Sequence, residues 1–166
     1  MQKPSVPAAE PAEPKGLSWG LESRLQFIDF RLRWERRINR MDLTEHFGIS
    51  VPQASLDISK YMELAPSNLT YDRSSKTYTA AQSFHPLYQR SSAQRYLAEL
   101  LATKMGIVEP TASFIGSAPE TDWAPSPWRT INEQTVEAVV RAIRQQESIL
   151  VSYQSMTSLD LSLIHI

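Results

Sequence analysis

The 166-residue chain contains no cysteine and only 5 glycines. The lack of cysteine excludes disulfide bonds, thiolate zinc sites and cysteine nucleophiles, and it fits a reducing compartment. No apolar run approaches the roughly 20 residues that a membrane-spanning helix needs, and the first residues lack the pattern of a secretory signal. The net charge is −1, so the chain as a whole is not a polycation. We therefore expect a cytoplasmic protein without a membrane partner, whose contacts with nucleic acid would depend on local clusters of charge.

Motifs of known catalytic and metal sites are missing as well. The sequence has no phosphate-binding loop, no G-x-S-x-G and no H-E-x-x-H. His46, His85 and His165 stand far apart and belong to no cluster of metal ligands. The sequence thus predicts no catalytic residue, no metal and no cofactor, and a nucleotide-dependent enzyme is the least favoured class of function.

Two proline-rich stretches divide the chain. Residues 1–19 combine repeated prolines with few large apolar groups, which predicts a disordered tail. Residues 107–129 also carry repeated prolines and are expected to form a loop or linker.

Three helices are predicted after the tail. The first, residues 21–39, has two apolar stripes on nearly opposite sides, one of Leu21, Leu25, Ile28 and Leu32, the other of Phe27, Phe30, Trp34 and Ile38. The second, residues 43–47, follows a D-x-x-E capping pattern at Asp42 and ends before Gly48. The third runs from an S-x-x-Q capping box at Ser50 to about Ala65, with an inner face of Val51, Ala54, Ile58, Tyr61 and Met62.

A β-hairpin is predicted directly after these helices. In residues 67–81 apolar and β-branched residues alternate around the polar turn Asp72–Ser75. Three helices followed by a hairpin give a winged helix-turn-helix over residues 20–84. The fold class is therefore mainly α with a small β-hairpin, α+β.

The rest of the chain is predicted to hold a connector and the start of another domain. Residues 91–105 suit a connector helix, so that residues 85–129 form a connector helix and linker. A T-x-x-E box at Thr130 opens a helix with apolar Val136, Val139, Val140 and Ile143, and one strand follows near residues 149–153. A helix and one strand bury too little to fold alone, so residues 130–160 are interpreted as a truncated domain.

The last six letters, LSLIHI, resemble the in-frame translation of a sequencing-library adapter. We expect residues 161–166 to be non-native for that reason. The alternative is a natural apolar C-terminal strand.

The helix-turn-helix is the strongest functional signal, since it needs a short helix, a tight turn with glycine and a second helix whose first turn reaches base edges. A plain three-helix core is the alternative. Gln53 can pair with adenine and Ser55 with several bases, while Leu56 could contact a thymine methyl group. Gln53 could instead serve as a cap, and Leu56 could contact the wing or another subunit. The remaining candidates on this helix are Ser50, Ser59 and Lys60.

Phosphate contacts are expected from two groups of side chains. Arg73, Lys76 and Tyr78 belong to the hairpin, and Arg36, Arg37 and Arg40 lie at the predicted end of the first helix. A solvated face with pairs such as Asp29–Arg33 and Arg31–Glu35 is the alternative for that helix. Because Arg36, Arg37 and Arg40 have no acidic partner at i−4, phosphate or subunit contact stays open for them.

Residues 21–86 resemble the N-terminal domain of WYL-domain transcription regulators, in particular those that repress anti-phage defence operons of the BREX and CBASS kinds. The resemblance is carried by FIDFRLRWERRINRMDL at 27–43, FGISVPQASLDISKY at 47–61, LAPSNLTYDRSSKTY at 64–78 and FHP at 84–86. TVEAVVRAIRQQESILVSYQSM at 135–156 is similar to the first helix and strand of a WYL domain, an Sm-like β domain. The W-Y-L tripeptide itself is absent, so no effector-binding residue is assigned.

The resemblance implies a sequence-specific repressor of a defence operon that binds an inverted repeat in double-stranded DNA as a homodimer. It also implies a nucleotide or nucleic-acid effector at the WYL domain. A winged-helix protein-interaction module without DNA readout is the alternative, suggested by the second apolar stripe of the first helix.

Overall fold

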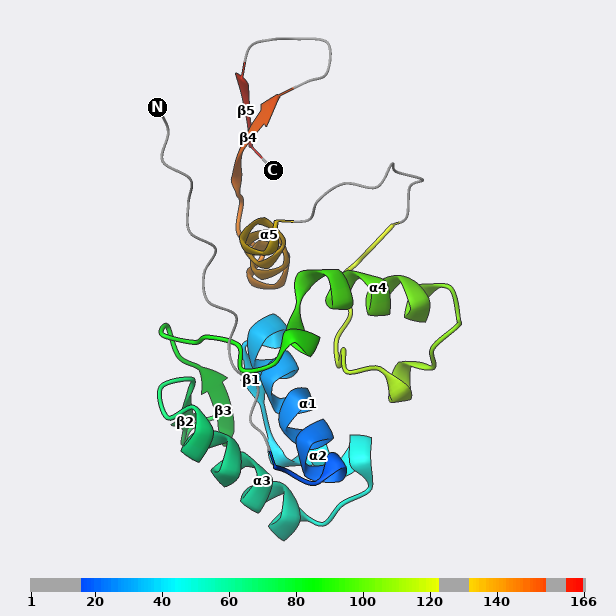
Figure 1. Ribbon diagram of the computed structural model, residues 1–166. Coiled ribbons are helices and arrows are strands. Elements are labelled where there is room, and N and C mark those ends of the chain that lie inside the picture. The colour runs from blue at the N-terminus through cyan, green and yellow to red at the C-terminus, as the bar shows by residue number, and fades with distance from the viewer. Residues whose placement is uncertain (1–15, 123–131, 155–160, 166) are drawn as a thin grey trace. The chain divides into compact units, whose positions relative to one another are not determined.

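The computed structural model describes residues 16–122, 132–154 and 161–165, with side chains for 16–122 and 132–150. The chain divides into two compact units, residues 1–116 and 117–166. The first unit holds the elements α1 (Trp19–Glu35), β1 (Arg37–Ile38), α2 (Arg40–Phe47), α3 (Val51–Leu64), β2 (Leu69–Asp72), β3 (Thr77–Ala80), the 3-10 helices η1 (Gln89–Ser91) and η2 (Pro110–Ala112), and α4 (Ala93–Lys104) (Figure 1). Residues 1–15 of the predicted tail lie outside the described residues.

The wing is a three-stranded antiparallel sheet in the order β1-β3-β2 (Figure 1). The hairpin of β2 and β3 confirms the sequence prediction, with Leu69 opposite Ala80 and Asp72 opposite Thr77. The third strand, β1, was not predicted and pairs Arg37 with Thr79. Helices followed by this small sheet confirm the α+β class.

The boundary between α1 and α2 corrects the sequence analysis. The first helix ends at Glu35 because Arg36 takes a left-handed conformation with φ 61°, and the chain then enters β1. The second helix starts at Arg40 through a capping box in which Asn39 Oδ1 accepts from the Asp42 backbone N–H at 3.0 Å and Asp42 Oδ2 accepts from the Asn39 N–H at 2.7 Å. Asp42 is thus the N3 residue and not the cap. Gly48 closes α2 in the left-handed region, as predicted.

The first apolar stripe of α1 forms the core of the winged helix. Leu25, Ile28 and Leu32 are fully buried, together with Leu43 of α2 and Ile58 and Tyr61 of α3.

The second stripe of α1 is covered by residues that follow the wing. The Trp34 ring stacks on Tyr96 of α4 with ring centroids 4.3 Å apart, and its Nε1 donates to the Ser91 carbonyl at 2.8 Å. Phe114 meets Phe27 and Phe30 edge to face. Residues 107–116 are loop apart from η2, in line with the predicted loop or linker, and they pack into the first compact unit.

Asp29 corrects the predicted polar face of α1. Its carboxylate is buried and accepts hydrogen bonds from Tyr61, Ser91 and the backbone N–H groups of Leu87 and Tyr88. It is therefore not the surface partner of Arg33, whose Nη1 donates to the Ser91 carbonyl at 3.0 Å. The other predicted pair, Arg31–Glu35, is present at 2.9 Å.

The second unit contains α5 (Glu133–Gln145), β4 (Leu150–Gln154) and β5 (Leu161–His165). Asn132 caps α5 by accepting from the Thr135 N–H at 2.9 Å, while the predicted cap, Thr130, lies outside the described residues. Two antiparallel strands, with Leu150 opposite His165, replace the single strand that was predicted. The expectation that residues 161–166 are non-native stays a prediction.

Candidate nucleic-acid interface

The third helix presents its outward face from a fixed N-terminus. Ser50 Oγ accepts from the Gln53 backbone N–H at 3.3 Å, which is half of the predicted capping box. Leu56 is 64% exposed, and Ser59 is exposed as well. Val51 and Met62 were predicted on the inner face, but they are 48% and 39% exposed. The solvent face of α3 is therefore wider and more apolar than predicted.

The Gln53 side chain does not complete the capping box. Its Nε2 donates instead to Oδ1 of Asp57 at 2.9 Å. Asp57 in turn accepts from Nε of Arg24 at 2.6 Å, which ties α3 to α1. Neither Asp57 nor Arg24 was singled out in the sequence. The spacing Gln53–Asp57 at i, i+4 was the available signal, because such pairs face each other on a helix.

Two other candidates on α3 have partners within the helix. Ser55 Oγ donates to the Val51 carbonyl at 3.0 Å, and Lys60 Nζ lies 2.8 Å from Glu63 Oε2. Both contacts are at the surface, where a hydroxyl can turn and an exposed ion pair contributes at most about 1 kcal/mol. Both groups therefore stay available for a ligand.

Two cations stand at the tip of the wing. Arg73 and Lys76 are exposed, and Lys76 takes a left-handed conformation with φ 54° in the turn. Asp72 holds this turn by accepting from Ser74 Oγ at 2.7 Å and from Ser75 Oγ at 2.6 Å. These hydrogen bonds favour the carboxylate and lower the pKa of Asp72 to about 2. The tip is thus an organised loop that displays both cations.

Arg40 and Tyr78 meet beside the wing. Arg40 Nη2 donates to the Tyr78 hydroxyl at 3.1 Å, and its guanidinium lies 5.7 Å from the centre of that ring. The Tyr71 ring lies beside Tyr78 with centroids 4.8 Å apart. The structure therefore brings two of the predicted residues together with one, Tyr71, that was not named.

Arg36 and Arg37 occupy different environments although they are neighbours. Arg36 Nη2 donates to the carbonyls of Ala80 and Ala81 at 3.2 and 3.0 Å, so this side chain holds the end of the wing. Arg37 is exposed on β1. The sequence analysis placed both residues with Arg40 at the end of the first helix. Because α1 ends before Arg36, the three arginines do not share a helical face.

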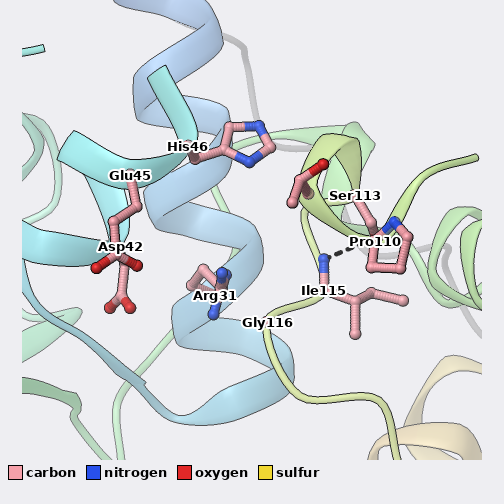
Figure 2. A pocket seen from close by; sticks show the side chains of 9 residues that line it. Arg31, Asp42, Glu45, His46, Pro110, Ser113, Ile115 and Gly116 are labelled. Atoms are coloured by element: carbon pink, nitrogen blue, oxygen red, sulfur yellow. Dashed lines mark hydrogen bonds between the residues drawn. The ribbon is translucent and has the colours of Figure 1, made fainter. Parts of the chain in front are cut away.

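A separate cavity of about 180 Å³ lies between α2 and residues 110–116 (Figure 2). Arg31 lies below it, Asp42, Glu45 and His46 border it from α2, and Ser113 and Ile115 face them. The Arg31 guanidinium packs so tightly on Gly116 that a Cβ there would lie 1.7 Å from Nη1. A side chain at this position would have to displace the Arg31 guanidinium. The mixture of one arginine and two carboxylates gives the cavity no clear preference for an anion or a cation.

Comparison with known families identifies the domain. A family model described as the BrxR transcriptional regulator winged helix-turn-helix domain matches residues 20–102. The chain belongs to this family. The match extends into α4 as far as residue 102 and so includes Tyr96, which packs on α1.

Curated relatives of this BrxR-family chain carry one name. Proteins named DNA-binding transcriptional repressor CapW from Escherichia coli (strain KTE188) and Pseudomonas aeruginosa are each 46% identical over 143 residues, which cover 86% of this chain and 48% of the relative. The relative of that name from Stenotrophomonas maltophilia is 48% identical over 138 residues, covering 83% of this chain and 46% of the relative. The chain thus spans about half the length of the curated relatives it matches. Their names describe repressors and no enzymatic activity.

Two other findings concern the part of the chain that the structure describes. It contains no group of three or more His, Cys, Asp or Glu side chains that could hold a metal ion. None of its helices is long and apolar enough to cross a membrane.

Proposed function

We propose that this chain is the DNA-binding part of a sequence-specific transcriptional repressor. The observation that carries the proposal is the exposed face of α3 beside a wing whose tip displays Arg73 and Lys76. A recognition helix that presents its first turn to the major groove needs such a face. Cations beside it would bind the phosphates of DNA. Such contacts supply much of the affinity but do not distinguish one base sequence from another. The names of the CapW relatives support the same function.

The proposed readers and anchors follow from exposure and position. Gln53, Ser55 and Leu56 read bases, and Ser50, Ser59 and Lys60 lie beside them on α3. Arg73 and Lys76 bind phosphate from the wing, and Arg37, Arg40 and Tyr78 bind it from the β1 side. Arg36 contributes by holding the wing in place.

We further propose that the full-length protein is a cytoplasmic homodimer on an inverted repeat, and that it represses a defence operon. An effector of nucleotide or nucleic-acid type at a WYL domain would relieve repression. The order of α5 and β4 supports this assignment, because it is the helix and strand expected at the start of that domain.

The alternative of a protein-interaction module loses its main support. It was suggested by the second apolar stripe of α1, and Phe27, Phe30 and Trp34 of that stripe are buried within the first unit.

The salt dependence of DNA affinity tests the proposal. Each phosphate contact contributes a slope of about −0.9 in a log–log plot of affinity against salt. We expect Arg73→Ala in the full-length protein to flatten that slope by about one unit and to weaken all sequences alike. Arg95→Ala on α4 is the control, since it removes the same charge outside the proposed interface. An unchanged slope for Arg73→Ala would show that Arg73 does not touch phosphate.

A further inference from the structure

A buried carboxylate lies on α3 itself, one turn after Gln53. The Asp57 side chain is 1% exposed and accepts two hydrogen bonds from Arg24, from Nε at 2.6 Å and from Nη2 at 3.2 Å. A bidentate pair of hydrogen bonds from one guanidinium fixes the orientation of a carboxylate as well as its position. Because Arg24 belongs to α1, the orientation of Asp57 is set by the core of the domain.

Gln53 is bound to the same carboxylate. Its Nε2 lies 2.9 Å from Oδ1, the oxygen that also accepts from Nη2 of Arg24. A carboxylate can only accept hydrogen bonds, so the amide nitrogen of Gln53 has to face it and the amide oxygen has to turn elsewhere. The amide nitrogen carries a second hydrogen, which stays free for another acceptor.

The free groups of Gln53 are the ones that adenine needs. Adenine presents an N7 acceptor and an N6 donor on its major-groove edge, and glutamine pairs with both groups at once. Gln53 stands in the first turn of α3, where its backbone N–H is held by Ser50. That turn is the part of a recognition helix that reaches base edges.

We infer that Asp57, oriented by Arg24, is a positioning residue that presents the Gln53 amide for the reading of one base pair, with a preference for A·T. The inference rests on the proposed DNA-binding function. Fixing the amide before DNA arrives removes the cost of ordering a long side chain on binding, about 0.5–1.5 kcal/mol for one such residue. By the usual conversion this is about a two- to tenfold effect on affinity.

A DNA library bound by the full-length protein tests the inference, with affinity measured for all four bases at each position. Gln53→Ala defines the base pair that Gln53 reads, where discrimination should fall by about 5- to 150-fold. We expect Arg24→Met to reduce discrimination at that same pair by about two- to tenfold. The double variant should discriminate no worse than Gln53→Ala alone.

A second arginine on α1 provides the matched control. Arg31 pairs with Glu35 at 2.9 Å and its side chain is 12% exposed, against 18% for Arg24. Arg31→Met removes a similar ion pair without touching α3, so its base preferences should equal those of the wild type. Should Arg24→Met fail to fold, Asp57→Asn gives the same comparison at nearly constant volume.

Other outcomes separate the inference from the function it rests on. If Arg24→Met weakened all sequences equally and kept the preference at the Gln53 pair, Asp57 would only tie α1 to α3. If Gln53→Ala left the base preferences unchanged at every position, the inference would be overturned, but the proposed function as a repressor would not be contradicted. A wild-type protein without any sequence preference would overturn the proposed function itself.

Discussion

Buried polar side chains carry connections that join distant parts of the first unit. Asp29 accepts from the Tyr61 hydroxyl at 2.6 Å, from the Leu87 N–H at 2.9 Å and from Ser91 Oγ at 2.9 Å. Burial raises the pKa of Asp29, and these hydrogen bonds act in the opposite direction. Burial and the neighbouring Asp29 also raise the pKa of Tyr61. One carboxylate therefore fastens both the recognition helix and the segment after the wing to α1.

His46 gives the stability of the domain a dependence on pH. Its ring stacks on Phe27 with centroids 4.6 Å apart and meets Phe47 and Phe114 edge to face. Burial lowers the pKa of His46 below the ordinary 6.5, and the nearby Arg31 lowers it further. The unfolded chain thus binds the proton more readily, so stability is full above pH 6.5 and falls as the pH drops through that value towards the lower folded pKa.

We expect His46→Phe to remove this component while keeping the aromatic contacts. Free energies of unfolding from urea titrations between pH 5 and pH 8, about the range in which histidine titrates, should fall more steeply towards acid for the wild type than for the variant. All other residues are the same in both proteins, so the difference between the two curves isolates His46. Parallel curves for the two proteins would mean that His46 takes up its proton as easily in the folded state.

At the scale of elements, the sequence predicted what depends on local patterns. The positions of α3 and of the β2–β3 hairpin follow from apolar spacing and turn residues, both of which act over a few residues. The end of α1 did not follow, because Arg36 is a non-glycine residue in the left-handed region. Such a residue has no strong local signal. The strand β1 was missed for a related reason, since two residues become a strand only by pairing with β3.

In the candidate interface, too, the features that depend on local patterns could be predicted and those that depend on distant residues could not. Exposure of Leu56, Arg73 and Lys76 followed from helix phase and turn position. The partners Asp57 and Arg24 could not be paired from the sequence, because they are 33 residues apart. The hydrogen bonds that Arg36 donates to the carbonyls of Ala80 and Ala81 also join residues far apart in the sequence, so they could not be predicted either.

The capping box of α2 offers a test of the corrected boundary. Asn39→Ala removes the side-chain acceptor of the Asp42 N–H, and loss of such a cap costs about 0.5–2 kcal/mol of stability. We expect a loss in that range from urea unfolding of the intact chain. Met41→Ala is the control, since it changes an exposed side chain of the same helix and leaves the cap intact. An effect as small as that of the control would indicate that α2 begins later, near Leu43.

At the scale of the whole molecule, the winged helix and the segment after it form one folding unit. Tyr88, Ser91, Tyr96 and Phe114 are buried, and they lie beyond the boundary at residue 84 that the sequence predicted. The second stripe of α1 has its cover here and not in a second copy of the chain. A sequence pattern can show that a helix needs cover on two sides, but the segment that provides it depends on long-range packing.

The fragments 1–84, 1–102 and 1–116 test whether the winged helix depends on the segment that covers it. Without residues 85–116, Phe27, Phe30 and Trp34 would be exposed, and burial of each such side chain contributes about 1.5–3 kcal/mol. Asp29 would also lose the donors at Leu87, Tyr88 and Ser91. The sum approaches the entire stability of a small domain, about 5–15 kcal/mol. We therefore expect the fragment 1–84 to be largely unfolded and 1–116 to unfold cooperatively in urea. The fragment 1–102, which keeps Tyr96 and lacks Phe114, should have an intermediate midpoint. Urea unfolding is measured by circular dichroism. Equal urea midpoints for 1–84 and 1–116 would show instead that the winged helix is stable without the segment that covers it.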